Sequence, residues 1–492
     1  MSFPPVLHRL GRPGLLLAAL FGMAATAQAQ VPSPSPPVPN IAEDEKDFLG
    51  LTSLALGSGA RAFGMGGAFL ARADDATAAS WNPAGLSYLR RPEFTVVGAR
   101  NSFVREPTGV GSRLLSDRFA GNTLDFAAAT YPIEIGPASG SVQLSFQRVF
   151  SFRGDRTIDR TDQLLTSEGS GGFDVVALGT GFRILRAVRI GGTVNRWVHG
   201  YHQDRARLAG RRGRGDTKQA VDLRLSGWNF NAGLIWSPIE SLSFGAVFKT
   251  TMKGAVEIDR VRQDEIPQPR PDPSATPPPP ITTTNAANST VLQVNCPDCT
   301  EEDRSKKATP HREPIGLSIP GAVGGGISWR PWSVLTASLD FTRTFWSKGR
   351  IHNFFTLART EPDQAYPFAD VFPELPYPTL DDPEQSDTEQ LRIGAEYVVL
   401  ARRLKLPLRV GFFTDKQFFL DDQGRPPRFH GFTAGVGLAA GPFLIDFAYL
   451  RETGKYLDPE ADPDDPEGRG AQRSTRFNRV FVSIIYRHGG GP

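Results

Sequence analysis

The chain lacks the features on which most assignments of function from sequence rest. It has only 2 cysteines and 7 histidines among 492 residues, and it contains no G-x-S-x-G, H-E-x-x-H or P-loop motif. So few cysteines exclude a disulfide-scaffold class, and the scattered histidines do not pair at the spacing of metal ligands. We therefore predict no catalytic site, no metal site and no cofactor.

Charge of one sign is missing too, because 55 Lys and Arg residues nearly balance 52 Asp and Glu residues. The net charge of +3 gives no indication of nucleic acid as a partner. After the N-terminus, no stretch approaches the roughly 20 apolar residues that a transmembrane helix needs. The mean hydropathy of -0.27 agrees. What the chain has instead is 51 glycines and 10% aromatic residues, a composition that favours β structure rich in turns.

Residues 1–29 are predicted to be a signal peptide. Basic residues precede a short apolar run at 15–23, and Ala27-Gln28-Ala29 has the small-x-small pattern of a signal-peptidase site. The run is too short to span a bilayer. Residues 30–47 follow as a Pro-rich linker, which cannot form a packed core. We expect an exported protein that begins at Gln30.

From about residue 93 onward, segments of about ten residues alternate between apolar and polar side chains, which is the pattern of strands with two different faces. Carboxylates repeatedly oppose the large apolar residues. Asp340 opposes Leu339 and Phe341, and Asp446 opposes Phe447. The same pattern places Asp125 opposite an apolar set of Leu124, Phe126 and Ala128. Alternation alone fits both a soluble sandwich and a membrane barrel.

The lengths of the connections separate these two folds. About fourteen strands are predicted between residues 94 and 487, and short turns alternate strictly with long loops along the chain. That alternation on an even number of antiparallel strands is typical of a transmembrane β-barrel with short periplasmic turns and long extracellular loops. A sandwich has no reason to gather its long loops at one end. The predicted long loops are 104–123, 153–172, 203–220, 254–319, 347–388, 417–428 and 452–475.

The predicted fold class is therefore an all-β, about fourteen-stranded antiparallel transmembrane β-barrel over residues 93–488. An even strand count puts both ends of the barrel on the periplasmic side, so residues 48–92 begin beside the barrel mouth. About sixty residues between the cleavage site and the first strand exceed what a tether needs. We predict that residues 48–92 form a plug in the lumen.

The stretch 57–86 carries a resemblance to a known family. Its runs Gly-Met-Gly-Gly-Ala-Phe at 64–69 and Asp-Asp-Ala at 74–76, followed by Trp-Asn-Pro-Ala-Gly-Leu at 81–86, resemble the N-terminal signature of the FadL/TodX superfamily of outer-membrane transport proteins. They look especially like the PorV-like branch. A weaker similarity covers 317–346. The resemblance implies a fourteen-stranded barrel with an N-terminal hatch, in which hydrophobic ligands enter from outside and leave through a gap in the wall.

The candidate site combines this hatch with charged lumen positions. Burying Asp74 and Asp75 without partners is costly, so we expect backbone N–H groups or lumen bases to satisfy them. Such pairs either release the hatch when ligand binds or simply fix it in place. The predicted hatch and gating residues are Arg61, Gly66, Gly67, Asp74, Asp75, Trp81, Asn82, Pro83, Ala84 and Gly85. The predicted lumen charge network is Asp125, Arg224, Lys249, Asp340, Arg392, Glu396, Arg409 and Asp446.

The outer loops give weaker signals. Cys296 and Cys299 are expected to form a local disulfide, within a Pro- and Thr-rich insert at about 260–315 that we expect to be disordered. The acidic run 458–465 lacks the spacing of a Ca²⁺ loop, so a solvated loop is favoured over a cation site. A basic set that could attract lipopolysaccharide phosphates comprises Arg205, Arg207, Arg211, Arg212 and Arg214.

Two hypotheses of function follow. The first is an outer-membrane channel or transporter for hydrophobic small molecules such as long-chain fatty acids. The second is a PorV-like barrel that anchors or shuttles secreted or envelope proteins at the outer membrane, with its long loops as docking elements. A soluble periplasmic all-β protein is a third, less favoured alternative. Expected partners are outer-membrane lipid, lipopolysaccharide and a hydrophobic ligand.

Overall fold

The computed structural model describes a large part of residues 57–489. The segments outside this description are 108–116, 152–153, 161–162, 210–216, 265–280, 286–289, 295–314, 349, 353–385, 402–403, 419, 422 and 458–471, together with both termini. At the outer ends of several strands only the backbone is described. The predicted signal peptide, linker, cysteine pair and acidic run all lie outside the described residues, as do Arg211, Arg212 and Arg214.

The chain divides into two units, residues 1–40 and 41–492, and the described residues all belong to the second. Among the described residues, three short helices precede the strands, namely α2 (Ala60–Gly64), α3 (Ala78–Trp81) and the 3-10 helix η2 (Pro83–Tyr88). A further 3-10 turn, η3 (Trp346–Lys348), lies within the strand region. None of the described helices is long and apolar enough to cross a membrane.

The strands follow in order. They are β1 (Glu93–Pro107), β2 (Asp117–Ile135), β3 (Ala138–Ser151), β4 (Gly154–Arg160), β5 (Gln163–Arg183), β6 (Val188–Val198), β7 (Gly200–Ala209), β8 (Thr217–Ile239), β9 (Leu242–Lys249), β10 (Met252–Asp264), β11 (Ile281–Asn285), β12 (Thr290–Val294), β13 (Ile315–Ile319), β14 (Ala322–Trp332), β15 (Leu335–Thr344), β16 (Arg350–His352), β17 (Thr388–Ala401), β18 (Leu404–Lys416), β19 (Arg428–Ala440), β20 (Phe443–Leu457) and β21 (Gln472–Arg487).

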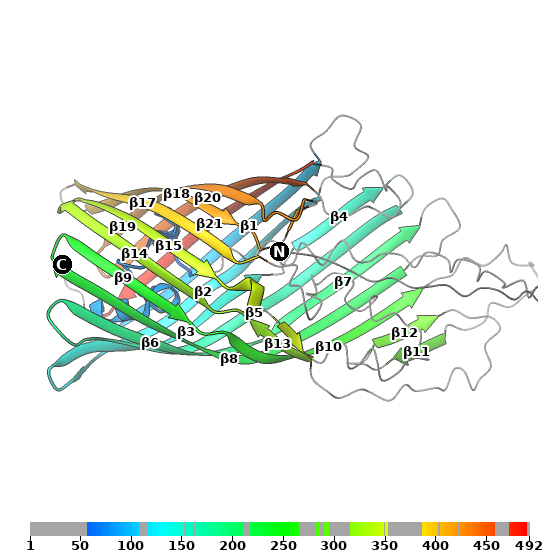
Figure 1. The fold of residues 1–492 in the computed structure, drawn as a ribbon, viewed down its shortest axis with the longest axis horizontal. Coiled ribbons are helices and arrows are strands. Elements are labelled where there is room, and N and C mark those ends of the chain that lie inside the picture. Colours follow the sequence, from blue (N-terminus) through cyan, green and yellow to red (C-terminus); the bar gives the residue numbers. More distant parts are fainter. Residues whose placement is uncertain are drawn as a thin grey trace, which may run out of the picture. The chain divides into compact units, whose positions relative to one another are not determined.

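These strands form one closed sheet (Figure 1). The last strand, β21, pairs antiparallel with β1 from end to end, which closes the barrel and leaves the wall without a free edge. Several wall strands are split in two along their length, as in β6 and β7 or β9 and β10, and β11 and β12 form an additional hairpin. Counted as continuous strands, the wall is a closed 14-stranded antiparallel barrel. This confirms the predicted fold class.

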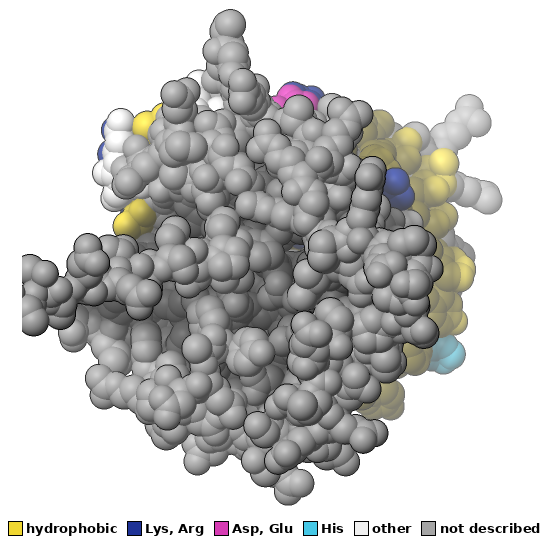
Figure 2. Space-filling view, turned by 90° about the vertical axis from the view of Figure 1, so that its right-hand side faces the viewer, with side chains coloured by type: hydrophobic (Ala, Val, Ile, Leu, Met, Phe, Trp, Pro, Cys, Tyr) yellow, Lys and Arg dark blue, Asp and Glu magenta, His cyan; other side chains and the backbone are white. Residues whose placement is uncertain are grey.

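The two faces of the wall differ as the alternation predicts. On β15, Leu339 and Phe341 are exposed on the outer surface, whereas Ser338 and Asp340 are buried inside. The same division holds for β17 and β20, where Ile393 and Phe447 are exposed. Figure 2 shows hydrophobic side chains gathered along the outer side of the barrel. An apolar outer band around a polar lumen is the arrangement of barrels that meet lipid.

The predicted alternation was wrong for the part of β2 that follows Asp125. The register with β1 shifts at this point, because Val97 pairs with Phe126 while Gly98 pairs with Leu124. Asp125 is therefore the extra residue of a β-bulge, and Asp125 and Phe126 are both buried. One inserted residue moves the side chains that follow to the opposite face. Phe126 and Ala128 consequently face the lumen instead of the outer surface.

Several predicted long loops are partly strands. β4 pairs with the first part of β5, and β7 pairs with both β5 and β8, so the wall continues through much of 153–172 and 203–220. Within the predicted disordered insert, β10 continues to Asp264 and residues 281–294 contain the β11–β12 hairpin. Those segments are rich in Thr and Val, which favour strands. We call the end of the barrel that carries these predicted long loops the long-loop end, and the opposite end the short-turn end.

Candidate functional site

Residues 57–89, here called the lumenal segment, lie inside the barrel. In Figure 1 their helices appear as blue coils enclosed by the strands. Helix α2 contacts β18 to β21, whereas η2 contacts β3, β5, β6 and β8, so the segment reaches walls on opposite sides of the lumen. Most of its side chains are buried.

Trp81 is the packing centre of the lumenal segment. Its ring lies edge-on to Phe63 and to Phe69, with centroid distances of 5.5 and 6.2 Å. Its indole N–H donates to the main-chain oxygen of Ser58 at 2.7 Å, so the buried nitrogen is satisfied. Phe63 also stacks at 4.3 Å on Phe481 of β21, which carries the packing into the wall.

Asn82 joins the lumenal segment to two wall strands. Its side-chain nitrogen donates to the main-chain oxygen of Leu70 within the segment at 2.8 Å. It also donates to those of Leu234 of β8, at 3.1 Å, and Ala246 of β9, at 3.4 Å. Its side-chain oxygen accepts from the N–H of Ala84 at 3.1 Å and so caps η2, where Pro83 at the first position has no N–H to satisfy. The Asn-Pro-Ala run is thus a structural junction, since these partners are all protein backbone.

A belt of glycines on the lumen face lets the segment approach the wall backbone. A Cβ on Gly233 would collide with the side-chain oxygen of Asn82, and one on Gly394 would collide with the carbonyl of Met65. Gly181 of β5, Gly191 of β6 and Gly233 are neighbours in the strand register. The sequence analysis missed this belt. Its signal is glycine recurring at lumen-facing positions in strand after strand, which marks close backbone approach.

Charged side chains hold the other half of the segment. Arg61 lies 2.7 Å from Asp74 within the segment and 3.3 Å from Glu396 of β17. Arg409 of β18 completes the cluster, with its guanidinium 2.7 Å from Glu396 and 2.5 Å from Asp446. Asp446 and Glu396 are nearly fully buried, so each needs its cation.

Arg72 belongs to the same cluster and was not predicted. It lies 3.0 Å from Glu396 and 3.5 Å from Asp74, and it also donates to the hydroxyl of Thr336. One oxygen of Asp75 accepts from the N–H and hydroxyl of Thr77, at 2.8 and 2.6 Å, and the other lies 3.8 Å from Arg61. Burial raises the pKa of Asp75, against the opposing effects of Arg61 and Thr77.

Three residues of the predicted lumen network bind the backbone of the segment. Asp340 accepts from the N–H groups of Phe69 and Leu70, at 2.6 and 2.7 Å. Arg392 donates to the carbonyl of Gly66 at 2.9 Å, and Lys249 donates to the carbonyl of Ser80 at 3.1 Å.

Gly66 has a φ of +69°, and Gly67 has a φ of +76°, a conformation that favours glycine over other residues. The turn after α2 therefore depends on both glycines, and Arg392 holds it through the carbonyl of Gly66.

Asp125 binds a partner that the sequence analysis missed. Arg479 of β21 lies 2.8 Å from it, and the hydroxyl of Ser58 donates to its other oxygen. Arg479 also packs over the ring of Phe481 at 4.7 Å. The first described residues of the lumenal segment are thus held at the β21 wall.

The prediction of a lumen-facing Arg224 was wrong. Its side chain is exposed, whereas its neighbour Leu225 is buried. Leu225 therefore takes the lumen face and Arg224 the outer face. This part of β8 lies toward the long-loop end, beyond the last exposed apolar residue of that strand, Trp228. There the outer surface meets water, so a polar side chain no longer marks the lumen.

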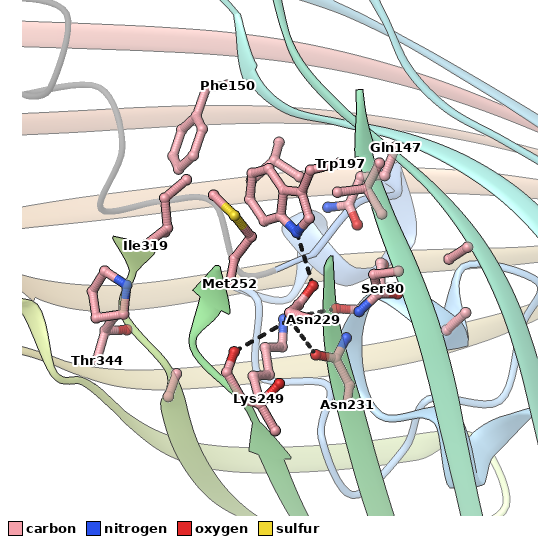
Figure 3. Close-up of a pocket in the computed structure, with 18 of the residues that line it drawn as sticks. Ser80, Gln147, Phe150, Trp197, Asn229, Asn231, Lys249, Met252, Ile319 and Thr344 are labelled. Carbon is pink, nitrogen blue, oxygen red and sulfur yellow. Dashed lines mark hydrogen bonds between the residues drawn. The ribbon is translucent and has the colours of Figure 1, made fainter. Parts of the chain in front are cut away.

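A cavity of about 110 Å³ lies against the lumenal segment on the side of the long loops (Figure 3). Ala79 and Ser80 form its floor, and aromatic side chains including Phe150 and Trp197 line one side. Next to Trp197 is a polar group, in which Asn229 accepts from the Trp197 indole at 2.8 Å and donates to Asn231 at 3.2 Å. The cavity thus offers both ring faces and amide groups.

The wall beside this cavity is interrupted. β9 ends at Lys249 and β10 begins at Met252, while β13 ends at Ile319 and β14 begins at Ala322. We call the intervening residues the seam, which consists of Thr250, Thr251, Pro320 and Gly321.

In the seam, the N–H of Thr250 donates to the carbonyl of Phe230 at 2.9 Å, and threonine side chains supply further bonds. The N–H of Phe230 donates to the hydroxyl of Thr250 at 2.8 Å, and the N–H of Gly321 donates to that of Thr251 at 3.2 Å. Pro320 has no N–H to contribute. The seam is therefore held by fewer backbone hydrogen bonds than the paired strands. It lies directly beside the cavity, because Thr250 and Pro320 both line it.

Comparison with known proteins supports the fold. No protein-family model matches the chain, and no curated protein matches its sequence. Among solved structures, a FadL homologue of Pseudomonas aeruginosa is similar with a TM-score of 0.53 and 13% identity, over 88% of this chain and 98% of that one. The toluene transporter TodX of P. putida is similar with a TM-score of 0.50 and 11% identity, over 89% and 100%. The chain therefore shares the fold of these barrels.

Proposed function

We propose that this protein is an outer-membrane channel that passes hydrophobic small molecules inward. The observation that carries the proposal is the cavity of about 110 Å³ inside a closed barrel, between the lumenal segment and the long-loop end. The two structural neighbours named above, a FadL homologue and a toluene transporter, support it. The proposal includes export by the signal peptide 1–29 and no enzymatic activity.

The cavity favours a compact ligand. A protein cavity of about 150 Å³ is known to hold benzene, so about 110 Å³ corresponds to roughly one small ring. Phe150 and Trp197 offer ring faces for such a ligand, and Asn231 offers an amide to a polar substituent. A long-chain fatty acid exceeds this volume and would extend toward the long-loop end. We therefore place small aromatic compounds before long-chain fatty acids as ligands.

The exit that we propose is the seam. The lumenal segment fills the barrel toward the short-turn end and is fixed by buried ion pairs, so a path straight through requires many contacts to break. Opening at the seam requires the loss of the two hydrogen bonds to threonine hydroxyls and of two backbone bonds. The backbone bonds run from the N–H of Thr250 to the carbonyl of Phe230, at 2.9 Å, and from the N–H of Phe345 to the carbonyl of Gly321, at 3.0 Å. A ligand in the cavity already touches Thr250. In this mechanism the segment directs the ligand sideways and stays in place.

The test is uptake of a labelled monoaromatic hydrocarbon by a host that lacks its own channels of this kind. We expect faster uptake with the protein than with an empty vector. Deletion of residues 57–86 removes the floor of the cavity, so directed uptake should be lost or replaced by unselective leakage. Unchanged, selective uptake after that deletion would refute the role of the lumenal segment.

A second candidate function is the PorV-like one, in which the barrel holds protein partners at the outer membrane. The β11–β12 hairpin, an addition to the wall within the longest predicted loop, favours it. Cross-linking in intact cells separates the two functions. A stoichiometric protein partner that depends on residues 281–294 supports the docking function, whereas its absence supports the channel.

A further inference from the structure

A row of three residues crosses the outer surface of the wall where the apolar band ends. Arg196 of β6 and Lys253 of β10 both pair in register with Trp228 of β8, one from each side. Trp228 and Lys253 are exposed, and Arg196 is partly exposed. We call these residues the rim row.

The position of Trp228 on its strand places the rim row at one boundary of the band. Exposed apolar side chains continue from Trp228 through Phe230 and Leu234 to Ile239 at the short-turn end. At about 3.3 Å per residue and a tilt of about 45°, this run spans about 26 Å along the barrel axis, close to the height of a lipid-facing band. Beyond Trp228 the outward residues are Ser226 and Arg224, which are polar and exposed. Trp228 therefore occupies the level of an interfacial aromatic girdle.

The cations of the rim row have no acidic partner among the described side chains. The guanidinium of Arg196 lies over the ring of Trp228, 5.0 Å from its centroid. Among the side chains that the structure describes, no carboxylate pairs with Arg196 or Lys253. Other basic residues near the long-loop end do have such partners. Arg148 binds Asp174 through two contacts of 2.7 and 2.8 Å, and Arg343 lies 2.9 Å from Asp387.

Two unpaired cations on strands two apart are separated by about 10 Å between backbones, with an indole between them. We propose that the rim row binds the phosphorylated headgroup of a glycolipid in the outer leaflet. Arg196 and Lys253 contact the phosphate, for which guanidinium and ammonium groups are suited, and Trp228 packs against the sugar. The inference rests on the proposed outer-membrane location, which puts the long-loop end in that leaflet, and is independent of the channel activity.

The experiment measures lipid binding to the full-length protein in detergent by native mass spectrometry. The probes are diphosphorylated lipid A, the same lipid without phosphates, and phosphatidylglycerol. The test variant is Arg196→Gln with Lys253→Gln. The matched control is Arg330→Gln with Lys405→Gln, which removes two exposed cations at the short-turn end. Heat-modifiable electrophoretic mobility shows whether each variant is folded.

The proposal predicts that the test variant binds phosphorylated lipid A at least about tenfold more weakly, because two charge-assisted contacts are lost. Binding of the phosphate-free lipid should be unchanged, and the control should bind like the parent protein. An equal loss with phosphate-free lipid, no loss at all, or equally tight binding of phosphatidylglycerol each overturns the assignment. Hydrocarbon uptake should be unaffected, so failure here is distinguishable from failure of the channel proposal.

Discussion

Arg61 in the lumenal segment lies 3.3 Å from Glu396 in strand β17, although the two residues are 335 positions apart in the chain. Glu396 also binds Arg409 at 2.7 Å, so a single buried carboxylate connects the segment to the wall. The glycine belt lets the backbone of the lumenal segment approach that of the wall strands, and the ion pairs of Glu396 then fix the position of the segment. Together they hold the segment whose Ala79 and Ser80 form the floor of the proposed ligand cavity.

Removing Arg409 should destabilise the barrel strongly. Arg409→Met leaves Glu396 and Asp446 buried without their shared cation, which costs about 3–5 kcal/mol. Urea titration followed by heat-modifiable electrophoretic mobility measures the change. The control is Arg428→Met, because Arg428 is 60% exposed and lies 3.9 Å from Glu389. A change of under about 1 kcal/mol is expected there. Equal effects of the two substitutions would contradict a structural role for the buried cluster.

A lumen residue of this site could be predicted only where it lies on a strand with regular alternation of polar and apolar side chains. Alternation correctly places Asp340, Glu396 and Asp446 in the lumen, because each lies on a regular strand within the apolar band. It fails just after Asp125, where one bulge residue moves Phe126 and Ala128 to the lumen face, and at Arg224, where the strand has left the band. Neither the bulge nor the end of the apolar band can be recognised from the local amino-acid composition.

Which charged side chains pair with each other in the lumen was less predictable than which side chains face the lumen. Arg72 and Arg479 satisfy Asp74 and Asp125, yet Arg72 belongs to an irregular segment without periodicity, and Arg479 comes from the opposite end of the chain. Of the predicted lumen bases, Arg392 and Lys249 bind carbonyls of the segment, and Arg409 binds Glu396 and Asp446. Contacts between distant segments depend on how the lumenal segment folds, which alternation does not encode.

Asn82 offers a test of the junction between segment and wall. Asn82→Asp keeps the oxygen that caps Ala84 but replaces the donor to Leu70 and Leu234 with an acceptor. We expect it to be more destabilising than Asn82→Ala, which we expect to cost about 1–3 kcal/mol. Limited proteolysis of the lumenal segment should show the same order. The opposite order would mean that the amide donor contributes little.

The glycine belt predicts an effect of adding one methyl group. Gly233→Ala places a Cβ against Asn82, so the segment must shift, at a cost of about 1–3 kcal/mol. Gly98→Ala is the matched control, because a Cβ there meets no atom within 4 Å. Urea unfolding and proteolysis of the segment are the measurements. If both variants behave alike, the close approach seen at Gly233 does not hold the segment.

The seam predicts a link between wall hydrogen bonds and transport. Thr250→Val removes the hydroxyl that accepts from the N–H of Phe230. Hydrogen exchange at Phe230 should accelerate, by about tenfold for a loss of about 1.4 kcal/mol, and uptake of a small aromatic compound should rise.

Thr180→Val serves as the control for the seam. The hydroxyl of Thr180 only donates to a carbonyl, that of Ser141, so its loss leaves no ladder N–H without an acceptor. Faster exchange at Phe230 in Thr250→Val with no change in uptake would remove the seam from the proposed route.

The cavity itself gives the most direct test of the channel proposal. Ala177 is buried in its lining, whereas Ala246 is exposed on the outer face of β9. Tryptophan at Ala177 should fill the space of about 110 Å³, and the same substitution at Ala246 should leave it open. The decisive measurement is the initial rate of labelled monoaromatic uptake by cells with equal amounts of each folded variant. The account predicts that Ala177→Trp abolishes uptake while Ala246→Trp retains the parent rate, and undiminished uptake by Ala177→Trp would contradict it.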